Sequence, residues 1–80
     1  MMHQFMNIGF DNMVSVDKIV AIVSPESAPV RRLVQEAKEA GRVVDVTHGR
    51  KTRAVVVTDS QYILLSAIQP ETLTGRLEHE

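Results

Sequence analysis

The chain has 80 residues, no cysteine and a formal net charge of −1. A chain of this length buries only a small hydrophobic core, so we expect one domain over residues 1–80 that gains stability from a further source. The lack of cysteine excludes disulfides and thiolate metal sites, and the three histidines, at positions 3, 48 and 79, are too scattered to hold a metal. Assembly with other copies of the chain is therefore the expected source of stability.

Composition and hydropathy narrow the class of protein. Aromatic residues make up 4% of the chain, which argues against a protein that stacks the bases of single strands on exposed rings. The N-terminus lacks a basic segment followed by an apolar one, and no apolar run approaches the length of a membrane span. We therefore expect a cytoplasmic protein, associated with the nucleoid if it binds DNA, without a membrane partner.

Three strands are predicted before residue 24. Gln4–Ile8 forms the first, Met13–Val16 the second, and the β-branched run Ile19–Val23 forms a buried third. The step Asp17-Lys18 between the second and third runs fits a bulge, a tight turn or an exposed pair equally well.

A helix is predicted from about Ser27 to Ala40. Pro29 falls in its first turn, where the missing N–H of proline costs nothing, and Gly41 is expected to end it. Apolar side chains recur at helical spacing and are expected to face the sheet: Val30, Leu33, Val34, Ala37 and Ala40.

Three more strands and a short helix complete the predicted order. The strand Val43–Thr47 is expected to reverse at residues 48–51 and to form a hairpin with Thr52–Thr58, because Gly49 permits the positive φ of a tight turn. A further turn leads to the strand Tyr62–Ile68, and Pro70 begins a helix that runs to about residue 77. Hairpin strands with one main helix predict an α+β domain with a small, mostly antiparallel sheet.

Catalytic motifs are missing from the sequence. No serine stands in a nucleophile-elbow motif, and Ser24 and Ser27 are better explained as helix caps. Asp45 and His48 are three residues apart on the expected hairpin, where their side chains do not point together. The glycines match neither phosphate-loop nor dinucleotide spacing. We expect no enzyme activity, no cofactor and no small-molecule substrate.

The basic turn at residues 48–51 is the strongest candidate for binding. Residues 46–58 contain no acid and carry Arg50, Lys51 and Arg53. Composition alone favours a solvated hairpin tip, whereas the lack of a compensating acid favours a prong of cations that reaches phosphate oxygens. Three charges neutralise about three phosphates and give a salt slope of about −3, which is weak for a regulator. Repetition of the prong in an oligomer would raise the affinity.

Three other cations are weaker candidates. Lys18 follows Asp17, and a solvated pair explains both. Arg31 and Arg32 lie near the start of the predicted helix, where the helix dipole disfavours positive charge. A carboxylate on a neighbouring subunit, a phosphate or no partner at all would each fit these two arginines.

Four stretches together resemble a known family, the RemA family of extracellular matrix regulatory proteins. The resemblance extends to about residue 77 without gaps and is carried by Asn-Ile-Gly-Phe at 7–10, Ile-Val-Ser-Pro-Glu-Ser-Ala-Pro at 22–29, Gly-Arg-Lys-Thr-Arg-Ala-Val-Val at 49–56 and Ser-Ala-Ile-Gln-Pro-Glu-Thr at 66–72.

The resemblance implies a bacterial transcription regulator that activates biofilm-matrix genes. It also implies a fold similar to LytTR-type DNA-binding domains and ring-shaped homo-oligomers. The DNA contacts of the family correspond to Arg50 and Lys51, with a further one at Lys18, and Pro29 corresponds to a position of subunit packing. Members of the family often have arginine at the positions of Lys18 and Lys51. Lysine keeps a point charge for phosphate but lacks the bidentate fork with which arginine reads guanine.

These features together predict a homo-oligomer that binds and bends or wraps duplex DNA through the basic turn. The alternative is an oligomeric interaction module in which Arg50, Lys51 and Arg53 pair with acidic residues of another subunit, such as Glu36 or Glu78. Charge alone does not separate DNA from RNA as the partner.

Overall fold

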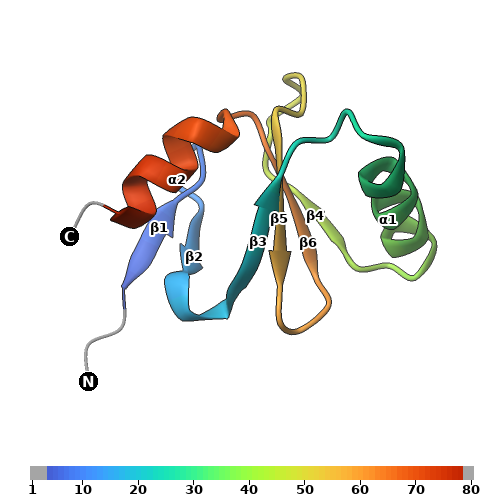
Figure 1. Cartoon of the computed structure of the whole chain (residues 1–80), viewed down its shortest axis with the longest axis horizontal. Coiled ribbons are helices and arrows are strands. Elements are labelled where there is room, and N and C mark those ends of the chain that lie inside the picture. The colour runs from blue at the N-terminus through green and yellow to red at the C-terminus, as the bar shows by residue number, and fades with distance from the viewer. Residues whose placement is uncertain (1–3, 79–80) are drawn as a thin grey trace.

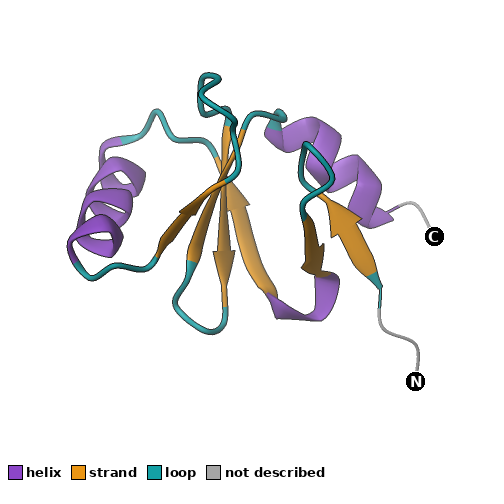
Figure 2. Cartoon of the chain, turned by 180° about the vertical axis from the view of Figure 1, so that it is seen from behind, coloured by secondary structure: helices purple, strands orange, loops and turns teal. Residues whose placement is uncertain are grey.

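The structure, a computed structural model that describes residues 4–78, is built in three layers (Figure 1). A four-stranded sheet forms the middle layer, one helix covers one face, and a pair of short strands with a second helix covers the other, as Figure 2 shows from behind. Histidines 3 and 79 lie outside the described residues. The elements in chain order are β1 (Phe5–Asn7), β2 (Met13–Ser15), a 3-10 turn (Val16–Lys18), β3 (Ile19–Val23), α1 (Ala28–Glu39), β4 (Val43–Asp45), β5 (Ala54–Thr58), β6 (Ile63–Ser66) and α2 (Pro70–Glu78).

The order of elements confirms the predicted α+β class with a mostly antiparallel sheet. In the four-stranded sheet the order is β3-β5-β6-β4, and β5 runs antiparallel to both of its neighbours. Strand β4 pairs with β6 in parallel. Strands β3 and β4 therefore run in the same direction, with the hairpin β5–β6 between them and α1 as their crossover, which is a split β-α-β arrangement.

The predicted hairpin between β4 and β5 is wrong. Strand β4 lies at the edge of the sheet and pairs with β6, so that Val43 faces Ile63, whereas β5 lies in the middle. The physical reason is burial, since β5 is apolar on both faces and Val55 and Val56 are fully buried there. In β4, Val44 is 43% exposed, which suits an edge. Local turn chemistry at residues 48–51 did not reveal this choice of partner.

Strand β3 also differs from its prediction as a buried strand. It forms the other edge of the sheet, and the register of its pairing with β5 shifts between Ile19 and Ala21. The residue at this shift, Val20, is 66% exposed. A β-branched run indicates a strand but does not distinguish an edge from the centre.

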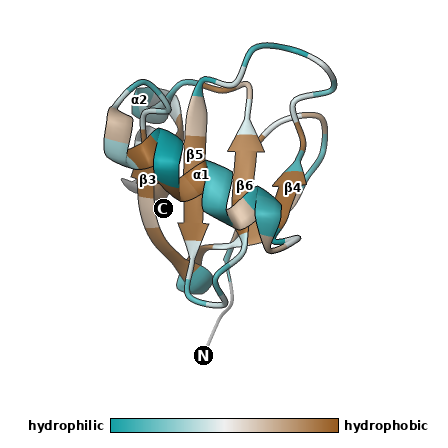
Figure 3. Cartoon of the chain, turned by 90° about the vertical axis from the view of Figure 1, so that its right-hand side faces the viewer, coloured by the Kyte–Doolittle hydropathy of each residue, from teal (hydrophilic) through white to brown (hydrophobic). Residues whose placement is uncertain are grey.

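Two hydrophobic clusters lie on the two faces of the four-stranded sheet. Alternate residues of β5 enter different clusters, as the two-residue period of a strand requires, so Val55 faces α1 and Val56 faces β1 and α2. The cluster beneath α1 includes Ala37, and Figure 3 shows this helix lying across the hydrophobic strands. The opposite cluster includes Met6 and Leu73. The sheet is thus held between two cores.

Helix α1 begins and ends where the sequence predicts. The hydroxyl of Ser27 accepts a hydrogen bond from the amide of Val30 at 3.3 Å, which caps the N-terminus, and Pro29 lies in the first turn. At the other end the amide of Arg42 donates to the carbonyl of Ala37, just past Gly41. The face of α1 that packs against the sheet is narrower than predicted, because Leu33 is 38% exposed and Ala40 is exposed as well.

Candidate nucleic-acid interface

The segment 46–53 between β4 and β5, which we name the basic loop, crosses the end of β6. The amide of Val46 donates to the carbonyl of Leu65 at 3.0 Å, and the amide of Arg53 donates to the carbonyl of Ser66 at 2.8 Å. In Figure 1 the loop is the yellow segment above the sheet. The expected hairpin tip is therefore a crossing loop whose two ends are tied to the same strand.

The tip of the basic loop is a tight turn. The amide of Arg50 donates to the carbonyl of Thr47 at 3.0 Å, and the central residues His48 and Gly49 have φ of +55° and +79°. Positive φ at both central residues is the pattern of a type I′ turn, so the conformation predicted for Gly49 is confirmed. The turn leaves the side chains of His48, Arg50 and Lys51 exposed.

A carboxylate at the end of β4 holds the start of the loop. One oxygen of Asp45 accepts hydrogen bonds from the hydroxyl of Thr47 at 2.6 Å and from its amide at 2.9 Å. These two hydrogen bonds hold the pKa of Asp45 below its usual value, and the one from the hydroxyl has the larger effect. The charge of Lys38 lowers the pKa further. Asp45 therefore serves as an ionised cap for the loop, and no hydrogen bond or ion pair joins it to His48 within the described residues.

An aromatic contact joins the basic loop to the turn that follows β1. The ring of Phe10 stacks on the ring of His48, with 4.3 Å between centroids and 6° between planes. The guanidinium carbon of Arg50 lies 5.7 Å from the centroid of the Phe10 ring. Phe10 itself has a positive φ of 53°, which is unusual for a bulky residue. Sequence reasoning missed this support, although an aromatic residue in a turn after Gly9 was a visible signal.

One hollow lies on the Arg50 side of the basic loop, and we name it the Arg50 hollow. It has a volume of about 500 Å³ and is lined by two arginines, Arg50 of the loop and Arg76 of α2. No carboxylate stands among the described residues that line it, which are Asn7, Gly9, Phe10, Arg50, Ala67, Ile68 and Arg76.

A second hollow, the Lys51 hollow, lies on the other side of the loop. Lys51 and Arg53 line it together, as strand alternation predicts for residues two apart. Two carboxylates, Glu26 before α1 and Glu71 in α2, line the same hollow. Its formal charges therefore cancel, whereas those of the Arg50 hollow add.

None of the three cations of the basic loop is neutralised by a salt bridge within the part of the chain that the structure describes. Arg50, Lys51 and Arg53 are exposed and form no ion pair with a carboxylate there. Glu26 and Glu71 share a hollow with two of them but stay outside ion-pair distance. The positive charge of the loop is thus free to meet an external anion.

Lys18 lies at the opposite end of the sheet from the basic loop. It ends the 3-10 turn, its side chain is exposed, and its carbonyl accepts a hydrogen bond from the amide of Asp59 in the β5–β6 turn at 2.9 Å. The five residues of β3 separate it from the loop end, a span of about 17 Å at ~3.3 Å per residue. Within one chain the 3-10 turn that contains Lys18 and the basic loop therefore lie at opposite ends of the sheet (Figure 1).

The residues considered for subunit packing lie on the first half of α1. Pro29, Arg31 and Arg32 are all exposed, and no described carboxylate forms an ion pair with either arginine. Arg31 lines a hollow together with Thr52 of the basic loop. It is therefore closer to the loop than Lys18 is, and it adds positive charge beside the Lys51 hollow.

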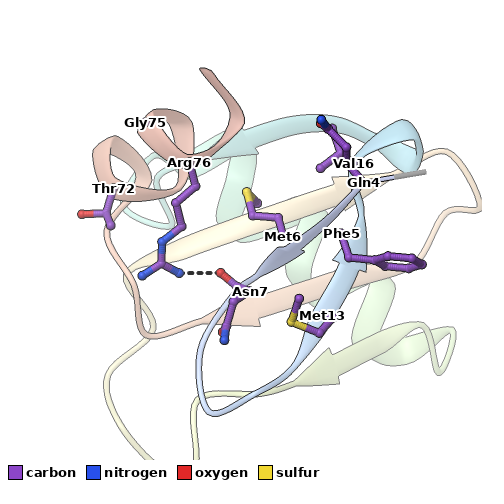
Figure 4. Close-up of a pocket in the computed structure, with 9 residues that line it drawn as sticks. All are labelled: Gln4, Phe5, Met6, Asn7, Met13, Val16, Thr72, Gly75 and Arg76. Carbon is purple, nitrogen blue, oxygen red and sulfur yellow. Dashed lines mark hydrogen bonds between the residues drawn. The ribbon is translucent and has the colours of Figure 1, made fainter. Parts of the chain in front are cut away.

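An apolar hollow of about 630 Å³ lies on the side of the molecule away from α1, between the β1–β2 pair and α2 (Figure 4), and it shares Asn7 and Arg76 with the Arg50 hollow. Phe5 and Met13 line it and are 62% and 55% exposed. Arg76 closes one side, where its Nη1 donates to the carbonyl of Asn7 at 2.5 Å. Sequence reasoning did not single out this surface.

A protein-family model identifies the family of this chain. The model of proteins like extracellular matrix regulatory protein A, called RemA-like, matches residues 5–77. This chain belongs to the RemA-like family. The resemblance stated from the sequence is thereby confirmed.

Curated relatives agree with this RemA-like assignment. A protein of Geobacillus thermodenitrificans is 57% identical over 77 residues, which cover 96% of this chain and 88% of the relative. A protein of Alkaliphilus metalliredigens is 62% identical over 74 residues, covering 92% of this chain and 80% of the relative. Both relatives carry the name "putative regulatory protein". The names indicate a regulatory role for the family and do not state what its members bind.

Residues 4–78 contain no group of three or more metal-binding side chains among histidine, cysteine, aspartate and glutamate. No helix there is long and apolar enough to span a membrane.

Proposed function

We propose that this chain is a DNA-binding transcription regulator that acts as a homo-oligomer and controls genes for extracellular matrix. The observation that carries the proposal is the basic loop, which presents Arg50, Lys51 and Arg53 without an ion-paired carboxylate. Phosphate contacts by such cations provide most of the affinity of non-specific DNA binding. The description of the matching family supports the link to matrix genes.

Assembly into a homo-oligomer, which the family resemblance implies is a ring, would compensate for the small number of charges on one chain. With three phosphate contacts, raising the salt from 50 to 200 mM lowers the DNA affinity about 40-fold. One chain alone would therefore bind little DNA at the higher salt concentration. Several loops on one particle bind a single duplex together and raise the effective concentration. The exposed Phe5 and Met13 offer an apolar surface for one subunit contact. The exposed Pro29, Arg31 and Arg32 on α1 offer a second, charged surface for another subunit contact.

Lys18 acts from a different position in this proposal. Because it lies at the other end of the sheet, it reaches the DNA only if neighbouring subunits bring their sheet ends together or if the duplex bends around the particle. We infer the second route, in which the duplex is bent or wrapped around the particle. The protein acts on DNA of the nucleoid.

Duplex binding across a salt series tests the proposal. The wild type is expected to bind with an affinity that falls steeply as salt rises, and Arg50→Ala is expected to bind about tenfold more weakly with a shallower salt slope. Equal affinities for the two proteins, or binding insensitive to salt, would contradict DNA binding through this loop.

The mass of the particle in solution separates this proposal from the interaction module. With Arg50, Lys51 and Arg53 all replaced by alanine, the DNA-binding proposal expects an unchanged oligomer that no longer binds the duplex. If the loop instead pairs with carboxylates of another subunit, the triple variant dissociates. A duplex RNA of equal length and sequence serves as the control for the type of nucleic acid.

A further inference from the structure

Arg76 of α2 is a cation outside the basic loop, and no sequence motif marks it as a binding residue. It lies in the last turn of α2 and is exposed, yet its guanidinium is held in place because Nη1 donates to the carbonyl of Asn7 at 2.5 Å (Figure 4). An arginine carries five N–H donors, so this hydrogen bond leaves the others available. A fixed guanidinium loses less side-chain entropy on binding than a mobile one.

Arg76 and Arg50 come together from distant parts of the chain. Arg50 is on the basic loop and Arg76 on α2, but both line the Arg50 hollow, where no described residue contributes a carboxylate. Arg50 is also restrained, because its guanidinium lies over the ring of Phe10. Two arginines that line one hollow suit a phosphate group, whose oxygens accept two or more charge-assisted hydrogen bonds.

We propose that Arg50 and Arg76 form a phosphate-binding site, with Arg76 as a phosphate contact in its own right. Two sources of phosphate fit this chemistry. One is a backbone phosphate of duplex DNA, in which case the inference rests on the proposed function. The other is the phosphate of a free small molecule. The site places the path of the phosphates on the Phe10 side of the basic loop.

Three variants test the DNA source. Arg76→Gln removes the charge but keeps an amide donor for the carbonyl of Asn7, whereas Arg76→Lys keeps the charge. Arg42→Gln is the matched control, because Arg42 also donates to a single oxygen, on Gln61, and lies at the other end of the sheet. Thermal melting of all three verifies folding, and duplex affinity is then measured from 50 to 200 mM salt.

The variants are expected to separate by charge. Arg76→Gln should bind about three- to tenfold more weakly and lower the salt slope by about one for each subunit in contact with the duplex, while Arg76→Lys retains most of the affinity. Arg42→Gln should match the wild type. Equal weakening in the Gln and Lys variants of Arg76 would show a structural role and overturn the inference. An unchanged Arg76→Gln beside a weakened Arg50→Ala would also overturn it, but would leave the proposed function standing.

Titration with inorganic phosphate tests the free source. At constant ionic strength, the Nε–Hε signals of Arg50 and Arg76 are followed by NMR with those of Arg42 as reference. If the wild type does not bind duplex DNA, the proposed function fails, and joint shifts of Arg50 and Arg76 with phosphate would support the site as one for a small phosphorylated molecule. If neither DNA binding nor these shifts occur, both proposals are overturned.

Discussion

The two sides of the basic loop differ in charge and in support. On one side, Arg50 and Arg76 line a hollow without carboxylates and an aromatic stack holds the loop. On the other side, Lys51 and Arg53 share their hollow with Glu26 and Glu71. The loop contributes cations to both sides, so the difference comes from the residues that surround it. Net charge along the sequence cannot reveal this, because Glu71 and Arg76 are both in α2 and yet line opposite hollows.

The strongest test of the support on the Arg50 side is Ser66→Ala. The hydroxyl of Ser66 is fully buried, donates to the carbonyl of Ile8 at 2.7 Å and accepts from the amide of Ile68 at 3.0 Å. Its loss leaves a buried carbonyl without a partner and is expected to lower the free energy of unfolding by about 1–3 kcal/mol, measured by urea denaturation. The control Ser60→Ala, at an exposed turn, should cost less than about 0.5 kcal/mol. Similar losses in both variants would refute the buried anchor.

The stack between loop and turn is tested by a double-mutant cycle. Phe10→Leu keeps an apolar side chain, and His48→Asn removes the ring with a residue that tolerates positive φ. The coupling between the two positions in the free energy of unfolding is expected to be about 0.5–1.5 kcal/mol. Additive losses, within about 0.3 kcal/mol, would mean that the loop and the turn are energetically independent.

Removing the acids of the Lys51 hollow would make the two sides alike. Glu26→Gln and Glu71→Gln are each expected to strengthen duplex binding by about two- to fivefold at low salt, a change of roughly 0.4–1 kcal/mol that fits one exposed charge. The control Glu39→Gln on α1 changes net charge equally but lies elsewhere. An equal gain in all three variants would show an effect of net charge alone.

The smallest effect is expected at Asp45, which accepts hydrogen bonds from Thr47 and so caps the start of the basic loop. Thr47→Val removes the hydroxyl donor to Asp45, so the pKa of Asp45 should rise toward its ordinary value, as followed by NMR titration of the carboxyl group. Because the pKa of Asp45 is lower in the folded protein than in the unfolded chain, its contacts stabilise the fold at neutral pH, and this stabilisation is lost as the pH falls through the folded value. The variant should therefore lose less stability on acidification. An unchanged pKa would show that the hydroxyl contact is not the main cause.

The features that were predicted correctly from the sequence are those that depend on residues close together in the chain. The helix with its Ser27 cap, the order of strands and the positive φ at Gly49 follow from local preferences, and all are present. The predicted pairing of β4 with β5 and the buried position predicted for β3 were wrong, because both depend on which strand is buried on both faces, a property of the whole sheet. The candidate site divides in the same way. Arg50, Lys51 and Arg53 were visible as a basic turn, whereas Phe10 and Arg76 join them only through the tertiary fold.

The crossing of β6 by the basic loop has a consequence for the order of folding during synthesis. Both ends of the loop are tied to carbonyls of β6, at Leu65 and Ser66, which follow the loop in the chain. Strands β3 and β4 likewise find their partners only in the later hairpin β5–β6. The cations therefore leave the ribosome before the strands that hold them, and the loop takes its shape only once that hairpin has inserted between the edges. A partly synthesised chain thus carries the positive charge of the surface but not its geometry.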